Sequence, residues 1–194
     1  MQIIQTINLK TMSFLPPKTK RPESSSGNYM RFEEGENRIR IVTDAITGWL
    51  YWVKDGDKNK PVRVKDMPEE VPAEALPDKF GNYVKEFYAF GVYNHKEKKV
   101  QILEVTQVSI QERIFDLHSD EDWGDPKGYD IKINRGEKGG RVEYTVQPVP
   151  HSELSMEVAS AVAEKPMNLN ALYEGKDPFD REYVDGTEIA RTLG

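Results

Sequence analysis

The segment from Glu86 to Thr106 constrains the fold of this chain more than any other. Period-two alternation marks two strands, Glu86–Tyr93 and Lys98–Thr106, joined by residues 94–97. Pairing across a loop of four residues places Tyr93 opposite Lys98. Each face of this hairpin carries apolar and aromatic side chains, so neither face is plainly polar. Such a hairpin needs a cover on both faces, unless one face awaits a partner.

The same periodicity predicts the other elements. Arg38-Ile39-Arg40-Ile41 alternates, Gly48 interrupts the pattern and Trp49–Val53 resumes it, so 37–53 reads as one long strand bent near residues 44–48. The remaining predictions are a proline-rich insertion over 54–85 with a short strand at Pro61–Lys65, a helix over Thr106–His118, strands at Tyr129–Arg135 and Arg141–Val149, and a short helix at Ser152–Ala163.

In chain order these elements are a long bent strand, a hairpin, a helix and a second hairpin. That order is typical of the five-stranded OB-fold, a barrel with its helix between the third and fourth strands. A generic antiparallel α+β domain is the alternative. The prediction is mainly β: an OB-fold barrel over 29–150, a flexible arm over 1–28, and a short helix with an acidic tail over 151–194. We expect residues 171–194, which are poorly patterned, to be disordered.

Missing residue types and motifs exclude several chemistries. The chain has no Cys, which removes disulfides, thiolate zinc sites and cysteine nucleophiles. The three histidines lie far apart and outside metal-ligand spacings, and the common nucleotide-binding and hydrolase motifs are absent. No apolar run has the roughly 18–20 residues that a membrane helix needs. We therefore expect a soluble, intracellular protein that is not an enzyme and holds no cofactor or metal.

The charge alternates along the chain. The net charge is −6, yet the segments predicted as strands are each slightly positive. The negative charge gathers in residues 66–78, 106–126 and 150–194, each of which sums to −5. A net-acidic protein can therefore still present a basic surface.

Single-stranded nucleic acid needs ring surfaces for its bases and cations for its phosphates. In an OB-fold it binds the face of strands two and three, which here is Glu86–Thr106, between the loops over 54–85 and 136–140. Alternation lets only one of Tyr51 and Trp52 point inward. The candidate rings are Trp49, Tyr51, Trp52, Tyr88, Phe90 and Tyr93, and the candidate cations are Arg38, Arg40, Lys54, Arg63, Lys65, Lys98, Lys99, Lys132, Arg135 and Arg141.

Several short motifs then follow one another in a familiar order. They are Ser26–Phe32, Gly35–Ile41, Gly48-Trp49, Tyr51-Trp52, Pro61–Arg63, Ala89-Phe90, Gln101–Gln107 and Asp122–Pro126. Their order resembles that of the small single-stranded DNA-binding proteins of tailed bacteriophages, over about residues 26–150. The resemblance implies an OB-fold that coats unwound DNA during phage replication and recombination, in the cytoplasm of the bacterial host and without catalysis. Because Cys is absent, it implies the zinc-free type.

The C-terminal Asp177-Pro178-Phe179-Asp180 resembles the acidic, Phe-bearing tail tip of bacterial homologues of that class. The resemblance implies that Asp177, Phe179 and Asp180 bind replication or recombination proteins and that the tail competes with DNA. A merely solubilising tail is the alternative. For the chain as a whole, the competing hypotheses are an OB-fold protein-interaction module without nucleic-acid binding, and a metal-dependent nuclease that uses its carboxylates.

Overall fold

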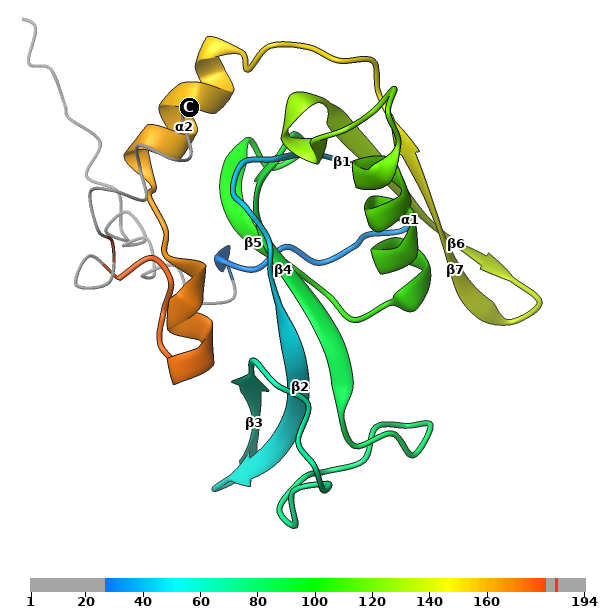
Figure 1. The fold of residues 1–194 in the computed structure, drawn as a ribbon, viewed down its shortest axis with the longest axis vertical. Coiled ribbons are helices and arrows are strands. Elements are labelled where there is room, and N and C mark those ends of the chain that lie inside the picture. Colours follow the sequence, from blue (N-terminus) through cyan, green and yellow to red (C-terminus); the bar gives the residue numbers. More distant parts are fainter. Residues whose placement is uncertain (1–26, 181–183, 185–194) are drawn as a thin grey trace, which may run out of the picture.

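The structure is a computed structural model that describes residues 27–180 and Val184 (Figure 1). Within that part of the chain, seven strands form one antiparallel sheet, and helices cover both of its faces. The mainly β prediction is confirmed. The elements are β1 (Gly35–Ile41), β2 (Ile46–Asp55), β3 (Lys58–Val64), β4 (Lys85–Asn94), β5 (Lys99–Val105), α1 (Val108–Ser119), η2 (Pro126–Gly128), β6 (Asp130–Lys138), β7 (Arg141–Pro148), α2 (Met156–Glu164) and η3 (Leu169–Glu174).

β1 and β2 are the two halves of the predicted long bent strand. Both pair with the same edge of β4, residues 39–41 with 92–94 and residues 46–50 with 85–89. At the bend, the Val42 N–H donates to the Gly91 carbonyl (2.9 Å), and the Gly91 N–H donates to Thr43 Oγ1 (2.8 Å). These bonds hold the bend against the middle of β4.

The sheet is not a closed barrel. Its strand order is β3-β2-β4-β1-β6-β7, with β5 on the other edge of β4. Closure would require β7 to meet β5, but within the described part of the chain the outer edge of β5 carries residues 28–30 instead, through a parallel bridge between Tyr29 and Ile102. The predicted barrel is therefore wrong in its closure. The prediction also made the third strand too short: it expected a strand only at Pro61–Lys65, whereas β3 spans Lys58–Val64.

The β4–β5 hairpin has the predicted faces but not the predicted register. Tyr93 pairs with Val100 rather than with Lys98. The shift arises in the turn, where Asn94 Oδ1 accepts from the backbone N–H groups of Lys96 and Glu97, and Lys98 adopts a φ of 51°. A register shift of two residues keeps every side chain on its face.

Two hydrophobic clusters cover the two faces of β4 and β5. The first lies between the sheet and α1 and includes Phe90, Leu103 and Ile114. The second lies on the opposite face, where Phe87, Tyr93, Val100 and Ile102 pack against Val158 and Val162 of α2 and Leu172 of η3. Figure 1 shows α2 and the following residues on the side of the sheet away from α1. Of the two sequence alternatives, a cover on both faces is the one observed.

The C-terminal region contributes this second cover, so the expectation of disorder is wrong for residues 171–180. Leu172 is 1% exposed, Pro178 is buried, and the Asn168 N–H donates to the Pro178 carbonyl at 2.8 Å. The prediction followed the acidic composition of this segment and overlooked its few apolar residues, which dock it against the sheet. Val184 apart, the rest of the tail and residues 1–26 of the predicted arm lie outside the described residues.

Gly91 tests this docking. A Cβ at position 91 would lie 2.6 Å from both Met167 Sδ and Thr43 Cγ2. We expect Gly91→Ala to lower the free energy of unfolding by about 1–3 kcal/mol, because the added methyl overpacks the junction of β4, the bend and the C-terminal layer. Urea denaturation measures this change. Gly136→Ala is the matched control, since a Cβ there meets nothing within 4 Å; an equal loss in both variants would contradict the prediction.

Candidate nucleic-acid interface

The sequence placed the binding surface on the hairpin Glu86–Thr106 without choosing a face. One face of β4–β5 packs against α1, and the other, which we call the outer face, is covered by the C-terminal layer. Tyr93 is 2% exposed, and its hydroxyl donates to Glu157 at 3.0 Å. Burial and this bond raise the pKa of Tyr93. Phe90 is buried in the first cluster, and Tyr88 is half-buried against it. Phe90 and Tyr93 therefore cannot stack on bases in this structure, which corrects their assignment as contacts.

Arg40 is also a structural residue rather than an exposed cation. Its side chain is 4% exposed, and Nε donates to Asp130 Oδ1 at 2.6 Å. Nη1 and Nη2 donate to the carbonyl and hydroxyl oxygens of Ser152. Arg38 and His95 reach the other oxygen of Asp130, at 2.7 and 3.1 Å. The Asp130 carboxylate thus ties β1, the β4–β5 turn and β6 together.

Rings and cations come together beside β3, β2, β4 and β5, where they line two hollows. The sheet curls so far that Arg63 Nε on β3 donates to Glu104 Oε2 on β5 at 2.6 Å, although two strands lie between them in the sheet. Two hollows of about 420 and 500 Å³ lie here, and Trp52 and Glu104 line both of them. We call this pair of hollows the Trp52 groove.

Three aromatic residues from different parts of the chain line the Trp52 groove. Trp52 is 42% exposed and stands between the hollows, while Tyr51 is half-buried, so the prediction that one of this pair is exposed is confirmed. Tyr29 lines the larger hollow and Tyr83 the smaller one. Burial raises the pKa of Tyr29 despite the nearby Arg63 guanidinium, so its ring is neutral.

Cations gather around the larger hollow. Arg31 and Lys60 are exposed on its lining, and Arg63 lies buried on its floor. Lys176 also lines it and forms an ion pair with Glu174 at 2.8 Å. A ring between two hollows, with cations beside it, is the arrangement that stacks bases and holds phosphates.

The loop that bounds the smaller hollow is fixed by Asp78. Its Oδ1 accepts from the backbone N–H groups of Phe80 and Asn82, and its Oδ2 pairs with Lys85 at 2.5 Å. The pKa of Asp78 lies well below its usual range, chiefly because of the hydrogen bond from the Lys85 ammonium and also because of these backbone bonds. The Leu76 N–H donates to the Trp52 carbonyl at 2.8 Å, which attaches the same loop to β2. Tyr83 is thereby presented beside Trp52.

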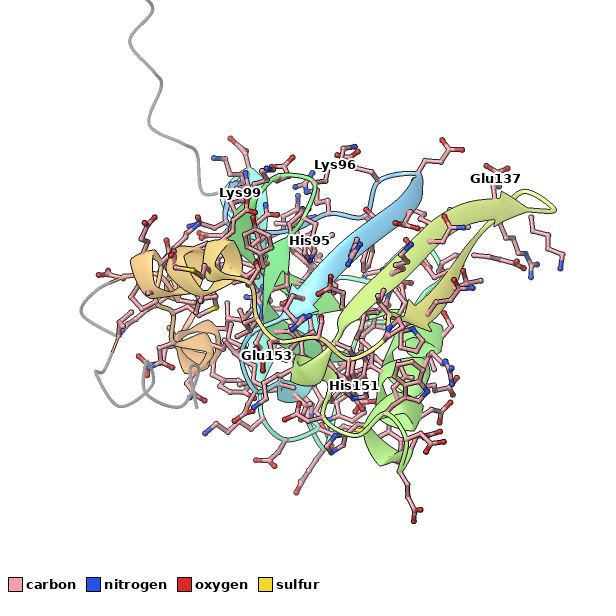
Figure 2. The ribbon with its side chains drawn as sticks, turned by 90° about the horizontal axis from the view of Figure 1, so that it is seen from above. His95, Lys96, Lys99, Glu137, His151 and Glu153 are labelled. Atoms are coloured by element: carbon pink, nitrogen blue, oxygen red, sulfur yellow. The ribbon has the colours of Figure 1, made fainter. Side chains whose placement is uncertain are left out.

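The structure disperses most of the other predicted cations. Four of them lie in ion pairs: Arg38 with Asp130, Lys98 with Glu157, Lys99 with Glu97, and Lys132 with Glu36. Figure 2 shows Lys99 and Lys96 together at the β4–β5 turn and Glu137 at the distant tip of the β6–β7 hairpin, the hairpin that carries Arg135 and Arg141.

The remaining predicted residues lie on or near the β2–β3 hairpin. Lys54 is exposed on β2, whereas Trp49 is half-buried. The Lys65 ammonium lies 5.3 Å from the centroid of the Tyr173 ring. Of the predicted contacts, only Trp52 and Arg63 line the Trp52 groove.

Sequence reasoning missed Tyr29, Arg31, Lys60, Tyr83 and Glu104. Tyr29 and Arg31 lie within the predicted domain but before its first predicted strand, and the bridge between Tyr29 and Ile102 brings them beside β5. The sole signal was their place in the motif Ser26–Phe32. Tyr83 was hidden within the proline-rich insertion.

A third hollow, of about 450 Å³, lies between the β1–β2 bend and α1. Ile41, Phe90, Ile114 and Phe115 make its lining mainly apolar, and Lys127 within it pairs with Asp44 at 2.6 Å. This hollow therefore has fewer cations for a backbone phosphate than the Trp52 groove has.

Asp177, Phe179 and Asp180 belong to the docked segment that follows η3 rather than to a free tail. Asp177 lines the larger hollow and accepts from the Phe179 N–H at 3.0 Å. The Phe179 ring packs against the second cluster, with the Lys165 ammonium 4.2 Å from its centroid. Phe179 could contact a partner through its full ring only if this segment undocked.

In the described part of the chain, no three His, Asp or Glu side chains are grouped so that they could hold a metal ion. No helix among the described residues is long and apolar enough to span a membrane.

The chain has a relative among known proteins. It is similar to a protein of Escherichia phage T5 named "Probable ssDNA-binding protein", with 29% identity over 142 residues. The similarity covers 62% of this chain and 54% of the T5 protein, so the chain matches about half of that relative's length. No protein-family model matches the chain. No solved structure matches it.

The Asp130 network generates a prediction about acid stability. Burial raises the pKa of Asp130, but hydrogen bonds from Arg40 and Arg38 outweigh it, so the pKa is lowered overall. A lowered folded-state pKa gives stability that is present above about pH 4 and is lost as pH falls further. We expect Asp130→Asn to cost about 3–5 kcal/mol at pH 7, because Arg40 stays buried and unpaired.

Urea denaturation between pH 3 and pH 7 measures both effects. The variant should also lose less stability on acidification than the wild type does. Glu36→Gln, which removes an exposed carboxylate from an ion pair with Lys132, is the control and should change stability by under about 1 kcal/mol. If the wild type and Asp130→Asn lost the same free energy of unfolding between pH 7 and pH 3, the account would be contradicted.

Proposed function

We propose that this protein binds single-stranded DNA of any sequence, and that the strand passes through the Trp52 groove. The observation that carries the proposal is the exposed Trp52 ring between two hollows, with Arg31 and Lys60 on the lining of the larger one. The similarity to the T5 protein supports the same class of ligand.

The proposed binding combines two physical terms. Bases stack on Trp52, Tyr29 and Tyr83, and each stack contributes about 1–3 kcal/mol. Arg31 and Lys60 contact phosphates, which releases counterions and makes the affinity fall with salt. Stacking tolerates any base because every base has a flat π surface.

The finer assignments belong to this proposal as well. We interpret the fold as an open, zinc-free OB-type sheet in which residues 28–30 take the place of the closing strand. The role that fits such a protein is protection of single-stranded DNA during phage replication and recombination in the bacterial host, by binding rather than by catalysis. Proteins of those processes are the partners we propose for the C-terminal region.

Two other functions would give different outcomes in one titration. A protein-interaction module would leave tryptophan fluorescence unchanged on adding dT20. A metal-dependent nuclease would shorten dT20 in the presence of Mg²⁺, which a denaturing gel detects. The proposed function requires quenching, with the oligonucleotide intact whether or not Mg²⁺ is present.

Lys60→Glu tests the position of the groove. We expect it to weaken binding of dT20 by about tenfold at low salt and to reduce the slope of log K against log salt by about 0.7 for each phosphate that the protein no longer neutralises. Fluorescence titration at several salt concentrations measures both quantities. Lys138→Glu is the matched control: it makes the same charge change on the β6–β7 hairpin and should leave binding within about twofold.

A second measurement on the same complex identifies the quenched tryptophan. The chain has three Trp residues. Trp52→Phe should remove most of the quenching, whereas Trp123→Phe should preserve it, since Trp123 packs against Tyr129 and His151 outside the groove. For the lysine pair described above, equal losses of dT20 affinity in Lys60→Glu and Lys138→Glu would show that the Trp52 groove is not the binding site.

In the docked segment, Asp177 is the residue that would compete with DNA. Its carboxylate lines the larger hollow near Arg63, so it opposes an incoming phosphate from its present position. We expect Asp177→Asn to tighten dT20 binding by about two- to fivefold at low salt, an effect that should vanish at high salt.

A truncation also tests whether the tail competes with DNA, provided that it leaves the docked segment in place. Cutting after Gly175 would remove the buried Pro178 and the packed Phe179, whereas cutting after Asp180 keeps both of them. Glu143→Gln, which removes an exposed carboxylate on β7, is the single-charge control for Asp177→Asn. Equal tightening by both substitutions would show that the effect is one of net charge and not of position.

A further inference from the structure

The floor of the Trp52 groove holds a carboxylate that base stacking and phosphate binding do not require. Glu104 lines both hollows, on either side of Trp52. Arg63 Nε donates to Glu104 Oε2 at 2.6 Å, and their side chains are 7% and 17% exposed. This hydrogen bond goes to one oxygen of the carboxylate, and a carboxylate has a second oxygen that can accept.

The ion pair makes this position compatible with an anionic ligand. The Arg63 guanidinium offsets the charge of Glu104, so the floor does not repel a passing strand as a lone carboxylate would. A base whose face lies on Trp52 presents its polar edge to the surroundings of the ring. Glu104, which lines the hollow on each side of that ring, is therefore placed to meet a base edge rather than a phosphate.

Bases differ in what they offer such an acceptor. Cytosine carries an exocyclic amino group at C4, which donates to a carboxylate. Thymine and uracil carry a carbonyl oxygen at the same position. The donor they offer is the ring N3–H, which lies between two carbonyl oxygens that repel a carboxylate. A carboxylate that meets the C4 carbonyl instead loses water without gaining a donor, which is unfavourable.

We infer that Glu104 is a specificity-determining residue that makes this protein favour cytosine over uracil or thymine at the base stacked on Trp52. The inference rests on the proposed function and deepens it: affinity comes from rings and cations, and a base preference comes from the groove floor. If Glu104 serves only as the partner of Arg63, the two pyrimidines bind equally.

The first test leaves the protein unchanged and compares dC20 with dU20 at pH 8, where cytosine stays unprotonated. The two oligonucleotides carry the same backbone, so the comparison isolates the base. We expect dC20 to bind about fivefold or more tightly. Equal affinities, or tighter binding of dU20, overturn the inference and leave the proposed function standing. Failure of both oligonucleotides to bind overturns the proposed function, and the inference with it.

The second test assigns the preference to a residue. Glu104→Gln keeps an oxygen that accepts from Arg63 and adds an amide that can donate to the uracil carbonyl. The ratio of dC20 to dU20 affinity should fall to within about twofold, chiefly because dU20 binds more tightly. Asp57→Asn, the same charge change at an exposed position beyond the end of β2, should keep the wild-type ratio. An unchanged ratio in Glu104→Gln overturns the assignment, and the wild-type comparison decides the inference if that variant does not fold.

Discussion

The β4–β5 hairpin is apolar on both faces, and the rest of the structure depends on covering it. One face forms the main core with α1, and the other is buried by Val158, Val162, Leu169 and Leu172 of the C-terminal layer. Burying these side chains contributes about 25 cal/mol for each Å² of apolar surface removed from water. A cover held by buried apolar side chains is part of the core rather than a removable lid.

This cover determines where a ligand can bind. With the outer face of β4–β5 occupied, exposed rings and cations meet instead on the curled sheet between β3 and β5, where the Arg63–Glu104 pair crosses the floor. Elsewhere the basic side chains named above mostly neutralise nearby carboxylates, as Arg38 and Arg40 do at Asp130. A chain with a net charge of −6 can therefore keep one locally basic groove.

Period-two alternation predicted the long bent strand, the faces of the β4–β5 hairpin and the exposure of either Tyr51 or Trp52. These features depend on side chains close together in sequence. The register of the hairpin depended on a turn closed by Asn94, which alternation does not encode. The groove was harder still, because Tyr29, Trp52, Tyr83 and Glu104 come from four segments that only tertiary packing unites. Within the C-terminal layer, the helix at Ser152–Ala163 was predicted and corresponds to α2. The docking of residues 171–180 was not predicted, because their few apolar side chains lie in an acidic, irregular stretch.

Photocrosslinking maps the path of the strand most directly. A mixed-sequence 20-mer carrying 5-iododeoxyuridine would be irradiated on the full-length protein, and the adducts located by mass spectrometry. The account predicts adducts on Tyr29, Trp52 and Tyr83. Adducts confined to Phe115 of α1 or to Tyr144 of β7, with none in the groove, would contradict it.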